Sequence, residues 1–246
     1  MSLSEAAGHT GKGKEPFSCT ECPLQTHSFC SALIGTPARR DRLDMRGSTT
    51  IGARQFAYKA KEKADRFAIL RAGWAIRFTH THDGRRQILA LLLPGDILAI
   101  EITTKGRITH PILALTPLQL CTFSAERFNR VASQDPSVML TTATILHDVR
   151  EAYEARIMDL GRSTAEERIA RLILDIKQRL ESAGLTTGNQ IPFPLRQQTI
   201  GDMLGLTQVH VSRVMSQIRK AGLISVDRET LVIENLDELK RIAAFD

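Results

Sequence analysis

The sequence predicts an α+β fold: a small antiparallel β-roll, then one long helix, then a compact helical domain that ends in a strand pair. Short apolar runs separated by Gly, Pro and Asp-Gly between about residues 45 and 130 indicate closely spaced strands. After Pro136 the apolar residues change to helical spacing, over 23 residues without Gly or Pro. The 246 residues are enough for two domains, each with its own core.

Residues 1–35 are expected to form a flexible segment that carries a cluster of cysteines. The first 18 residues are rich in Gly, Ser and Lys and offer little to bury. They lack the hydrophobic segment of a secretory signal, and no stretch of the chain approaches the roughly 20 apolar residues of a membrane span. We therefore expect a cytoplasmic protein with reduced thiols and no membrane partner.

Residues 36–133 are expected to form the β-roll. The turn at His82–Arg85 contains Asp-Gly, which supplies the positive φ angles of a tight hairpin turn, and Pro94-Gly95-Asp96 predicts the next turn. The predicted strands are Arg66–Leu70, Gly73–Phe78, Gln87–Leu93, Ile112–Leu115 and Leu118–Phe123.

Residues 134–161 are expected to form a dimerisation helix, which runs over Val138–Leu160 and ends at Gly161. An apolar series at helical spacing would suit pairing with a second copy of the chain, and packing against its own domain is the alternative. The series consists of Val138, Ile145, Val149, Ala152, Ile157 and Leu160.

Residues 162–246 are expected to form the C-terminal domain. Ser163-Thr-Ala-Glu166 predicts a capping box that opens a helix through Leu180, and residues 184–194 are expected to form a loop. Two further helices are predicted near Gln198–Leu204 and Gln208–Ala221. A strand pair, Leu223–Val226 and Leu231–Ile233, closes the domain.

The stretch Gln198–Gly222 has the pattern of a helix-turn-helix. Gly205 permits the tight turn, and Thr207 is placed to cap the second helix. Ile200, Leu204, Leu206, Val211 and Ile218 are expected to hold the two helices together. An ordinary helical pair with a solvated basic face is the alternative. Residues 162–246 carry 12 Lys and Arg against 11 Asp and Glu, so the net charge of the domain does not by itself indicate DNA binding.

The outer face of the second helix offers candidate DNA-binding residues. Arg213 is the first candidate for base recognition, because its rigid fork matches guanine O6 and N7. Ser212 and Gln208 rank second, and Val209 lies beside them. Arg219 and Lys220 are expected to contact phosphates or to cover the helix C-terminus, and His210 to pack or contact a phosphate.

The segment Leu204-Gly-Leu-Thr-Gln-Val-His-Val-Ser-Arg213 resembles the recognition-helix motif of the Crp/Fnr superfamily of bacterial regulators, and the resemblance covers nearly the whole chain. It implies a cyclic-nucleotide-binding-like β-roll, a dimerisation helix and a winged helix-turn-helix that binds DNA. His-Val-Ser-Arg resembles alphaproteobacterial members. The oxygen-sensing branch has a glutamate where this chain has Val209, so that branch's half-site cannot be carried over.

The β-roll departs from the family's cyclic-nucleotide pattern. Gly73–Phe78, Asp83–Leu89 and Leu93–Asp96 resemble the roll. Members that bind the nucleotide hold its phosphate with an arginine and a glutamate in a Gly-Glu-Leu turn. Here Ala99-Ile-Glu101 and Ile108-Thr109 stand at those places, with Arg107 one residue away. The pattern therefore argues against a cyclic-nucleotide cofactor.

The four cysteines are candidate metal ligands. Cys19, Cys22 and Cys30 form a C-x2-C-x7-C pattern, and Cys121 lies in a predicted strand. Thiolates at this spacing suit zinc or an iron–sulfur cluster. Resemblance to oxygen-sensing Fnr proteins implies a 4Fe-4S cluster held by all four. The alternatives are a zinc site or thiol redox pair in the N-terminal group, with Cys121 a buried apolar residue.

These features predict a homodimeric transcription regulator, not an enzyme. It would bind a palindromic double-stranded operator, respond to oxygen or redox state through the cluster, and contact RNA polymerase. The alternative is a regulator of the same family without a cluster, which senses a small ligand in the β-roll or its own thiol or zinc state. No phosphate-binding loop or nucleophile elbow indicates catalysis.

Overall fold

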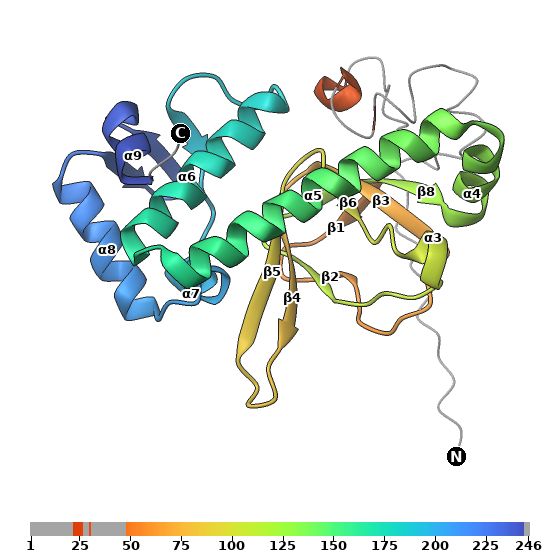
Figure 1. Ribbon diagram of the computed structural model, residues 1–246, viewed down its shortest axis with the longest axis horizontal. Coiled ribbons are helices and arrows are strands. Elements are labelled where there is room, and N and C mark those ends of the chain that lie inside the picture. The colour runs from red at the N-terminus through yellow and green to blue at the C-terminus, as the bar shows by residue number, and fades with distance from the viewer. Residues whose placement is uncertain (1–21, 27–29, 31–47, 244–246) are drawn as a thin grey trace.

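Two four-stranded antiparallel sheets form the β-roll of the protein (Figure 1). The computed structural model describes residues 22–26, 30 and 48–243. One sheet has the order β1 (Ser48–Ile51), β8 (Leu118–Ser124), β3 (Arg66–Ala72) and β6 (Ile97–Leu98). The other has the order β2 (Phe56–Tyr58), β7 (Ile112–Ala114), β4 (Ala75–His80) and β5 (Arg86–Leu92). A 3-10 turn at Pro23–Thr26 and the short helix α3 (Ile102–Lys105) accompany them.

The five predicted strands of the roll are confirmed within one or two residues. Strands β1, β2 and β6 were not predicted, because each is only two to four residues long and carries little periodicity. The Asp-Gly turn is also confirmed, but only Gly84 has a positive φ, of 83°. The connection is longer than a two-residue turn, and the Thr81 N–H donates to the Arg85 carbonyl at 2.8 Å.

Helix α5 (Pro136–Arg162) runs from the roll to the C-terminal domain (Figure 1). Asp135 caps it by accepting from the Ser137 N–H at 3.1 Å, and α4 (Ala125–Gln134) precedes it. The expectation that Gly161 ends the helix is wrong: Gly161 is helical, and the chain turns extended only at Ser163. Within the described ranges, no helix is long and apolar enough to span a membrane.

Part of the apolar series predicted for pairing packs within its own domain. Val138 is 1% exposed and, with Ile145, packs against the roll in one hydrophobic cluster. These two members of the predicted pairing series are therefore occupied within their own domain. Five exposed apolar side chains lie on a neighbouring face: Met139, Leu146, Val149, Ile157 and Leu160.

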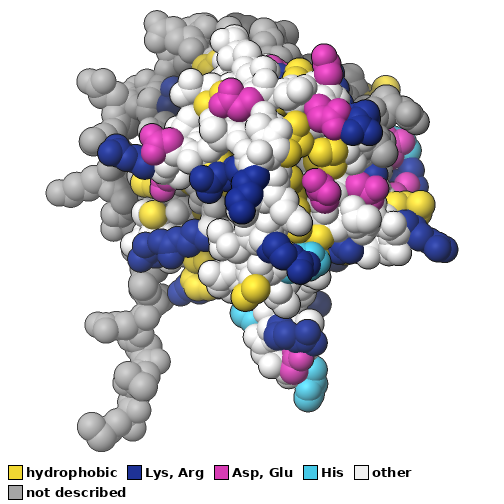
Figure 2. Space-filling view, turned by 90° about the vertical axis from the view of Figure 1, so that its left-hand side faces the viewer, with side chains coloured by type: hydrophobic (Ala, Val, Ile, Leu, Met, Phe, Trp, Pro, Cys, Tyr) yellow, Lys and Arg dark blue, Asp and Glu magenta, His cyan; other side chains and the backbone are white. Residues whose placement is uncertain are grey.

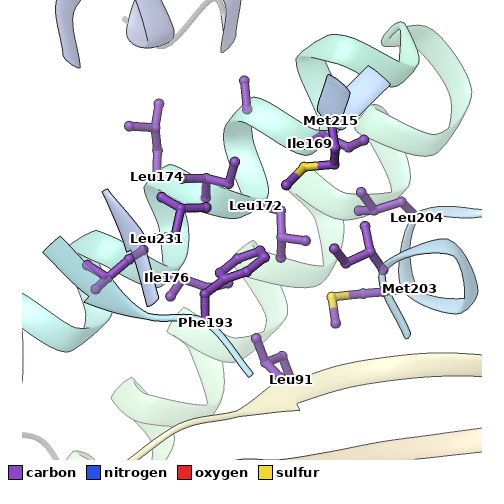
Figure 3. Close-up of a cluster of buried hydrophobic side chains, with 14 of the residues drawn as sticks. Leu91, Ile169, Leu172, Leu174, Ile176, Phe193, Met203, Leu204, Met215 and Leu231 are labelled. Atoms are coloured by element: carbon purple, nitrogen blue, oxygen red, sulfur yellow. The ribbon is translucent and has the colours of Figure 1, made fainter. Parts of the chain in front are cut away.

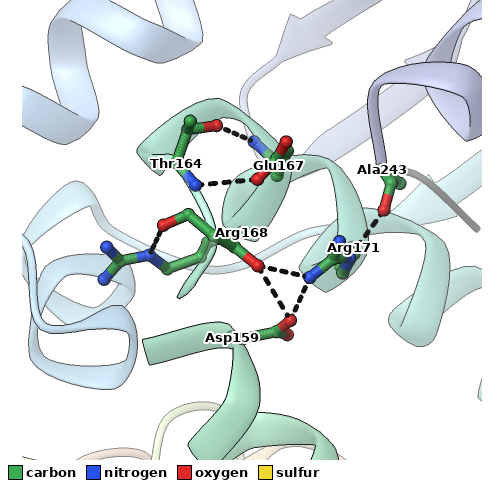
Figure 4. A network of polar contacts seen from close by, with 7 residues as sticks. Asp159, Thr164, Glu167, Arg168, Arg171 and Ala243 are labelled. Atoms are coloured by element: carbon green, nitrogen blue, oxygen red, sulfur yellow. Dashed lines mark hydrogen bonds and ion pairs between the residues drawn. The ribbon is translucent and has the colours of Figure 1, made fainter. Parts of the chain in front are cut away.

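The junction between α5 and α6 (Ala165–Ser182) is fixed by a polar network (Figure 4). The capping box exists but begins one residue later than predicted: Thr164 and Glu167 exchange hydrogen bonds of 3.3 and 2.8 Å. Arg171 pairs with Asp159 at the end of α5 and donates to the Ala243 carbonyl at 2.6 Å. The end of α5, the start of α6 and the C-terminal helix are thereby tied together.

The C-terminal domain is a winged helix-turn-helix. Helices α6, α7 (Gln197–Leu204) and α8 (Gln208–Lys220) pack together, and α9 (Leu236–Ala243) lies against α6. The predicted strand pair is confirmed as β10 (Ile224–Asp227) and β11 (Thr230–Ile233). The expected loop over residues 184–194 contains a third strand, β9 (Gln190–Pro192), which pairs with β11.

One hydrophobic core joins the β-roll to the helix-turn-helix (Figure 3). Leu91 of β5 points toward Leu172 of α6 and Met203 of α7, and all three side chains are at most 4% exposed. The remaining roll members of this cluster are Trp74, Ile76, Phe78, Ile88 and Leu93. The β4–β5 hairpin is therefore part of the core on which the C-terminal helices rest.

Two ion pairs lie at the edge of this shared core. Arg86 of β5 contacts Asp202 of α7 at 2.7 Å, with side chains 26% and 13% exposed. Arg179 of α6 pairs with Asp96 and donates to the Leu91 carbonyl at 3.3 Å. Burial raises the pKa of the Asp96 carboxyl, while Arg179 and the Leu93 N–H favour its charged form. Removing either partner of these pairs would leave a half-buried charge without its counterion.

We predict that Arg86→Ala destabilises the protein by about 1–3 kcal/mol, because the mostly buried Asp202 carboxylate loses its counterion and keeps only the hydrogen bond from Gln198. The neighbouring Arg85 pairs with Asp83 with its side chain 82% exposed, so Arg85→Ala should change stability by no more than about 0.5 kcal/mol. Urea unfolding of both variants measures the difference. Equal effects would show that the Arg86–Asp202 pair contributes nothing special.

We predict that Gly201→Ala destabilises the helix-turn-helix by about 1–3 kcal/mol through overpacking. A Cβ at Gly201 would lie 2.5 Å from the Leu206 carbonyl oxygen, so α7 and the turn must separate. Gly161→Ala is the matched control, because a Cβ there meets nothing within 4 Å and helix propensity rises by up to about 1 kcal/mol. Thermal unfolding compares the two, and a neutral Gly201→Ala would contradict the close approach.

Candidate nucleic-acid interface

Helices α7 and α8 are held at a fixed angle by the turn Gly205–Thr207. Gly205 adopts a positive φ of 66°, and the Leu206 N–H donates to the Gly201 carbonyl at 3.0 Å. Thr207 caps α8, as predicted, by accepting from the His210 N–H at 3.2 Å. Arg168 of α6 donates to the Leu204 carbonyl at 2.9 Å, which anchors the end of α7 to the domain.

The predicted inner face of the helix pair is confirmed. Its main members are at most 3% exposed and belong to the shared core: Ile200, Leu204, Val211 and Ile218. Leu206 packs partly buried against the same core. The opposite face of α8 is thereby left to solvent.

That outer face of α8 presents two parallel rows of side chains at four-residue spacing. Gln208, Ser212 and Ser216 form one row, and Val209, Arg213 and Gln217 form the other. Together with Gln197 at the start of α7 and Lys220 at the end of α8, they line one shallow hollow. Most of these groups donate or accept hydrogen bonds, so the surface can read polar atoms.

The sequence-predicted residues fall mainly on this face. Gln208, Val209, Ser212, Arg213 and Lys220 line the hollow. His210 is half-buried beside it, and Arg219 is exposed but does not line it.

Three lining residues were missed by the sequence reasoning: Gln197, Ser216 and Gln217. Ser216 and Gln217 follow Ser212 and Arg213 by four positions, so helical spacing alone could have found them. Gln197 could not be found this way, because it lies on the other helix.

The charge of the interface suits a polyanion. None of the residues that line the hollow is acidic, and the last turn of α8 carries Arg219 and Lys220. On the face of the molecule shown in Figure 2, Lys and Arg side chains gather in the middle and lower part, and Asp and Glu are more frequent above them. The other amides at the N-terminus of α8, which the Thr207 side chain does not accept from, add a partial positive charge.

Three of the four cysteines lie in one hydrophobic cluster. Cys30 is 7% exposed, and Cys22 and Cys121 pack against the same cluster partly buried. Cys121 lies on β8, opposite Ile69 of β3. Cys19 lies outside the described residues. Within the described part of the chain, no group of three or more His, Cys, Asp or Glu side chains is placed to hold a metal ion.

Glu101, Arg107 and Ile108, at or beside the family's nucleotide positions in the β-roll, have three different environments. Glu101 accepts a hydrogen bond from the Thr109 N–H at 3.4 Å, and the Arg107 side chain is exposed. Ile108 is 1% exposed and belongs to a small apolar cluster with Ile102.

Two family models match the chain, one for each half. The model described as a Crp-like helix-turn-helix domain matches residues 167–242. The model described as a cyclic nucleotide-binding domain matches residues 49–135. Together they cover the β-roll and the winged helix-turn-helix.

Similar proteins match over most of their length. The nitrogen fixation regulation protein FixK of Bradyrhizobium diazoefficiens is 28% identical over 211 residues, which are 85% of this chain and 86% of FixK. The transcriptional activator protein FnrL of Cereibacter sphaeroides is 28% identical over 221 residues, 87% of each chain. The solved structure of FixK2 from Bradyrhizobium japonicum superimposes with a TM-score of 0.72 at 26% identity, over 81% of this chain and 98% of that one. The chain therefore belongs to the Crp/Fnr family of DNA-binding transcription regulators.

Proposed function

We propose that this regulator binds a palindromic operator as a homodimer, with the outer face of α8 in the major groove, and that its cysteines make binding depend on redox state. The observation that carries the proposal is the exposed double row on α8, which presents Arg213 among hydrogen-bonding side chains. A helix of 13 residues is about 20 Å long, which suits the major groove. The protein is proposed to act in the cytoplasm, with double-stranded DNA and RNA polymerase as its partners.

The side chains of α8 divide into two proposed roles. Arg213 binds the O6 and N7 atoms of a guanine through its two-pronged guanidinium, and Ser212 and Gln208 add hydrogen bonds to base edges. Lys220 and Arg219 lie at the opposite end of the helix and contact phosphates, which position the helix but do not select a sequence. His210 packs beside the turn, with a phosphate contact as its second possible use.

We predict that Arg213→Ala weakens operator binding by about 1–3 kcal/mol per half-site and relaxes preference at one base pair. Lys220→Ala is the matched control on the same face: it should weaken all sequences alike and reduce the salt dependence of binding. Fluorescence anisotropy on selected and random duplexes at several salt concentrations separates these effects. If Arg213→Ala weakens both duplexes equally, Arg213 does not read a base.

The proposed dimer forms along the exposed apolar face of α5. Met139, Leu146, Tyr153 and Leu160 repeat every seven residues, as in a coiled coil. Val149 and Ile157 lie between them on the same face and are 41% and 68% exposed. Pairing of this face with its copy would set the two α8 helices for major grooves about 34–36 Å apart.

We predict that Ile157→Glu makes the protein monomeric and abolishes binding to the palindrome, because it places charge in the proposed dimer face. Met158→Glu is the control, since Met158 is similarly exposed at 65% but lies about 100° around the helix. Sedimentation equilibrium measures the oligomeric state. Equal behaviour of the two variants would place the dimer contact elsewhere.

The proposed redox sensor is an iron–sulfur cluster held by Cys19, Cys22, Cys30 and Cys121. Thiols are the donors such a cluster requires, and three of the four cysteines contact the same hydrophobic cluster, although the described side chains are not placed to hold a metal. When bound, the group would supply an oxygen-sensitive iron centre.

The contribution of the chain is to connect these thiols to α5. Val138 and Ile145 of α5 belong to the same hydrophobic cluster as Cys22, Cys30 and Cys121. A change in the cysteine ligands would therefore alter the packing behind the proposed dimer face. Because these side chains are contiguous, the state of the cysteines is proposed to bias how α5 pairs with its copy.

We predict that the protein purified without oxygen contains iron and sulfide, absorbs visible light, and loses both properties in the Cys121→Ser variant. Cys121 is partly buried on β8, so the serine should be accommodated and the variant should stay folded. Iron and sulfide assays and zinc analysis measure the metal content. A colourless, iron-free wild type that still binds its operator would eliminate the cluster and leave a zinc, thiol or ligand-sensing regulator.

A further inference from the structure

Val209 is exposed in a way that folding does not explain. Its side chain is 80% exposed, the highest fraction among the large exposed hydrophobic residues of the described chain. It is the second residue of α8, where a β-branched side chain has lower helix propensity than most alternatives. A valine at this position therefore neither stabilises the core nor favours the helix.

The surroundings of Val209 are polar. Gln208 precedes it, and Ser212 and Arg213 follow by one turn on the same face. A single apolar side chain among hydrogen-bonding groups is too small to be a protein docking patch. It can instead contact one small apolar group that is itself surrounded by polar atoms.

The major groove offers one such group. Guanine, cytosine and adenine present only donors and acceptors at their major-groove edges, while thymine adds the C5-methyl group. The two methyl groups of Val209 are held by a stiff χ1 torsion and project from the exposed face. Valine also has no acceptor for the cytosine amino group, so a cytosine facing it would leave a donor unpaired.

We infer that Val209 is a specificity-determining residue that selects a thymine by contact with its 5-methyl group. Val209 and Arg213 are one helical turn apart, about 6 Å between Cβ atoms, and base pairs are about 3.4 Å apart. The thymine therefore lies within about two base pairs of the guanine that Arg213 reads. The inference rests on the proposed function, since it requires α8 to lie in the major groove.

The test uses the full chain in its DNA-binding redox state. Selection from a random DNA pool gives the preferred operator, and each thymine of the half-site is then replaced by deoxyuridine in both halves. Deoxyuridine pairs like thymidine but lacks the methyl group. We expect one such replacement to weaken wild-type binding about three- to fivefold per half-site, as for one buried methyl group.

The Val209→Ala variant should show a much smaller difference between thymine and uracil operators at that position, because its shorter side chain reaches less far toward the methyl group. Because the side chain is exposed, the substitution should leave the fold intact. Gln217→Ala, in the same row, is the control and should keep the wild-type difference in affinity between thymine and uracil operators. Val209→Glu should change the preference at this position from T·A to C·G, since a carboxylate accepts from the cytosine amino group.

The outcomes distinguish failure of the proposed function from failure of the role of Val209. Wild-type protein that selects no sequence in any redox state overturns the proposed function. Sequence-specific binding that depends on Arg213, but is insensitive to every thymine-to-uracil change near its guanine, overturns the role of Val209 alone. A thymine effect that persists unchanged in Val209→Ala also overturns it.

Discussion

The arrangement of the molecule depends on one hydrophobic core that the β4–β5 hairpin shares with helices α6 and α7. Leu91 and Ile88 enter it from the roll, and Leu172, Ile173 and Met203 enter it from the helices. Burial of apolar area contributes about 25 cal/mol per Å², so a core of this kind holds two domains more firmly than surface ion pairs do. The turn that positions α8 rests on this core, and the exposed double row of α8 takes its orientation from it.

Helix α5 adds a second constraint, because its faces are divided between two tasks. Val138 and Ile145 pack into the hydrophobic cluster that three cysteines contact, while Leu146 and Ile157 remain exposed on the neighbouring face. At its end, Asp159 is fixed by Arg171 of α6. The helix therefore touches the proposed sensor at one end and the DNA-binding domain at the other, which is the connection that a redox-dependent regulator requires.

Local chemistry made much of this fold predictable from the sequence. The turn between α7 and α8 follows from Gly205 and Thr207, and the inner face of the helix pair follows from apolar spacing. The predictions were wrong where two neighbouring residues fit the same local pattern. Ser163 and Thr164 can both begin a capping box, and the extended backbone of Ser163, not Gly161, ends α5.

Contacts between distant residues could not be predicted in this way. Arg86 and Asp202 are 116 residues apart, and no local pattern pairs them. The three-residue strand β9 has too little periodicity to be distinguished from a loop. The candidate DNA-binding residues, in contrast, lie on one helix, so helical spacing placed most of them on one face before the structure was known.

The shared core is tested most directly by native-state hydrogen exchange under increasing denaturant. If the roll and the helix-turn-helix unfold through one core, the slowest amides of β5 and those of α6 and α7 should exchange with the same opening free energy and the same denaturant dependence. Exchange of α6 and α7 at a clearly lower free energy, while β5 stays protected, would contradict the account.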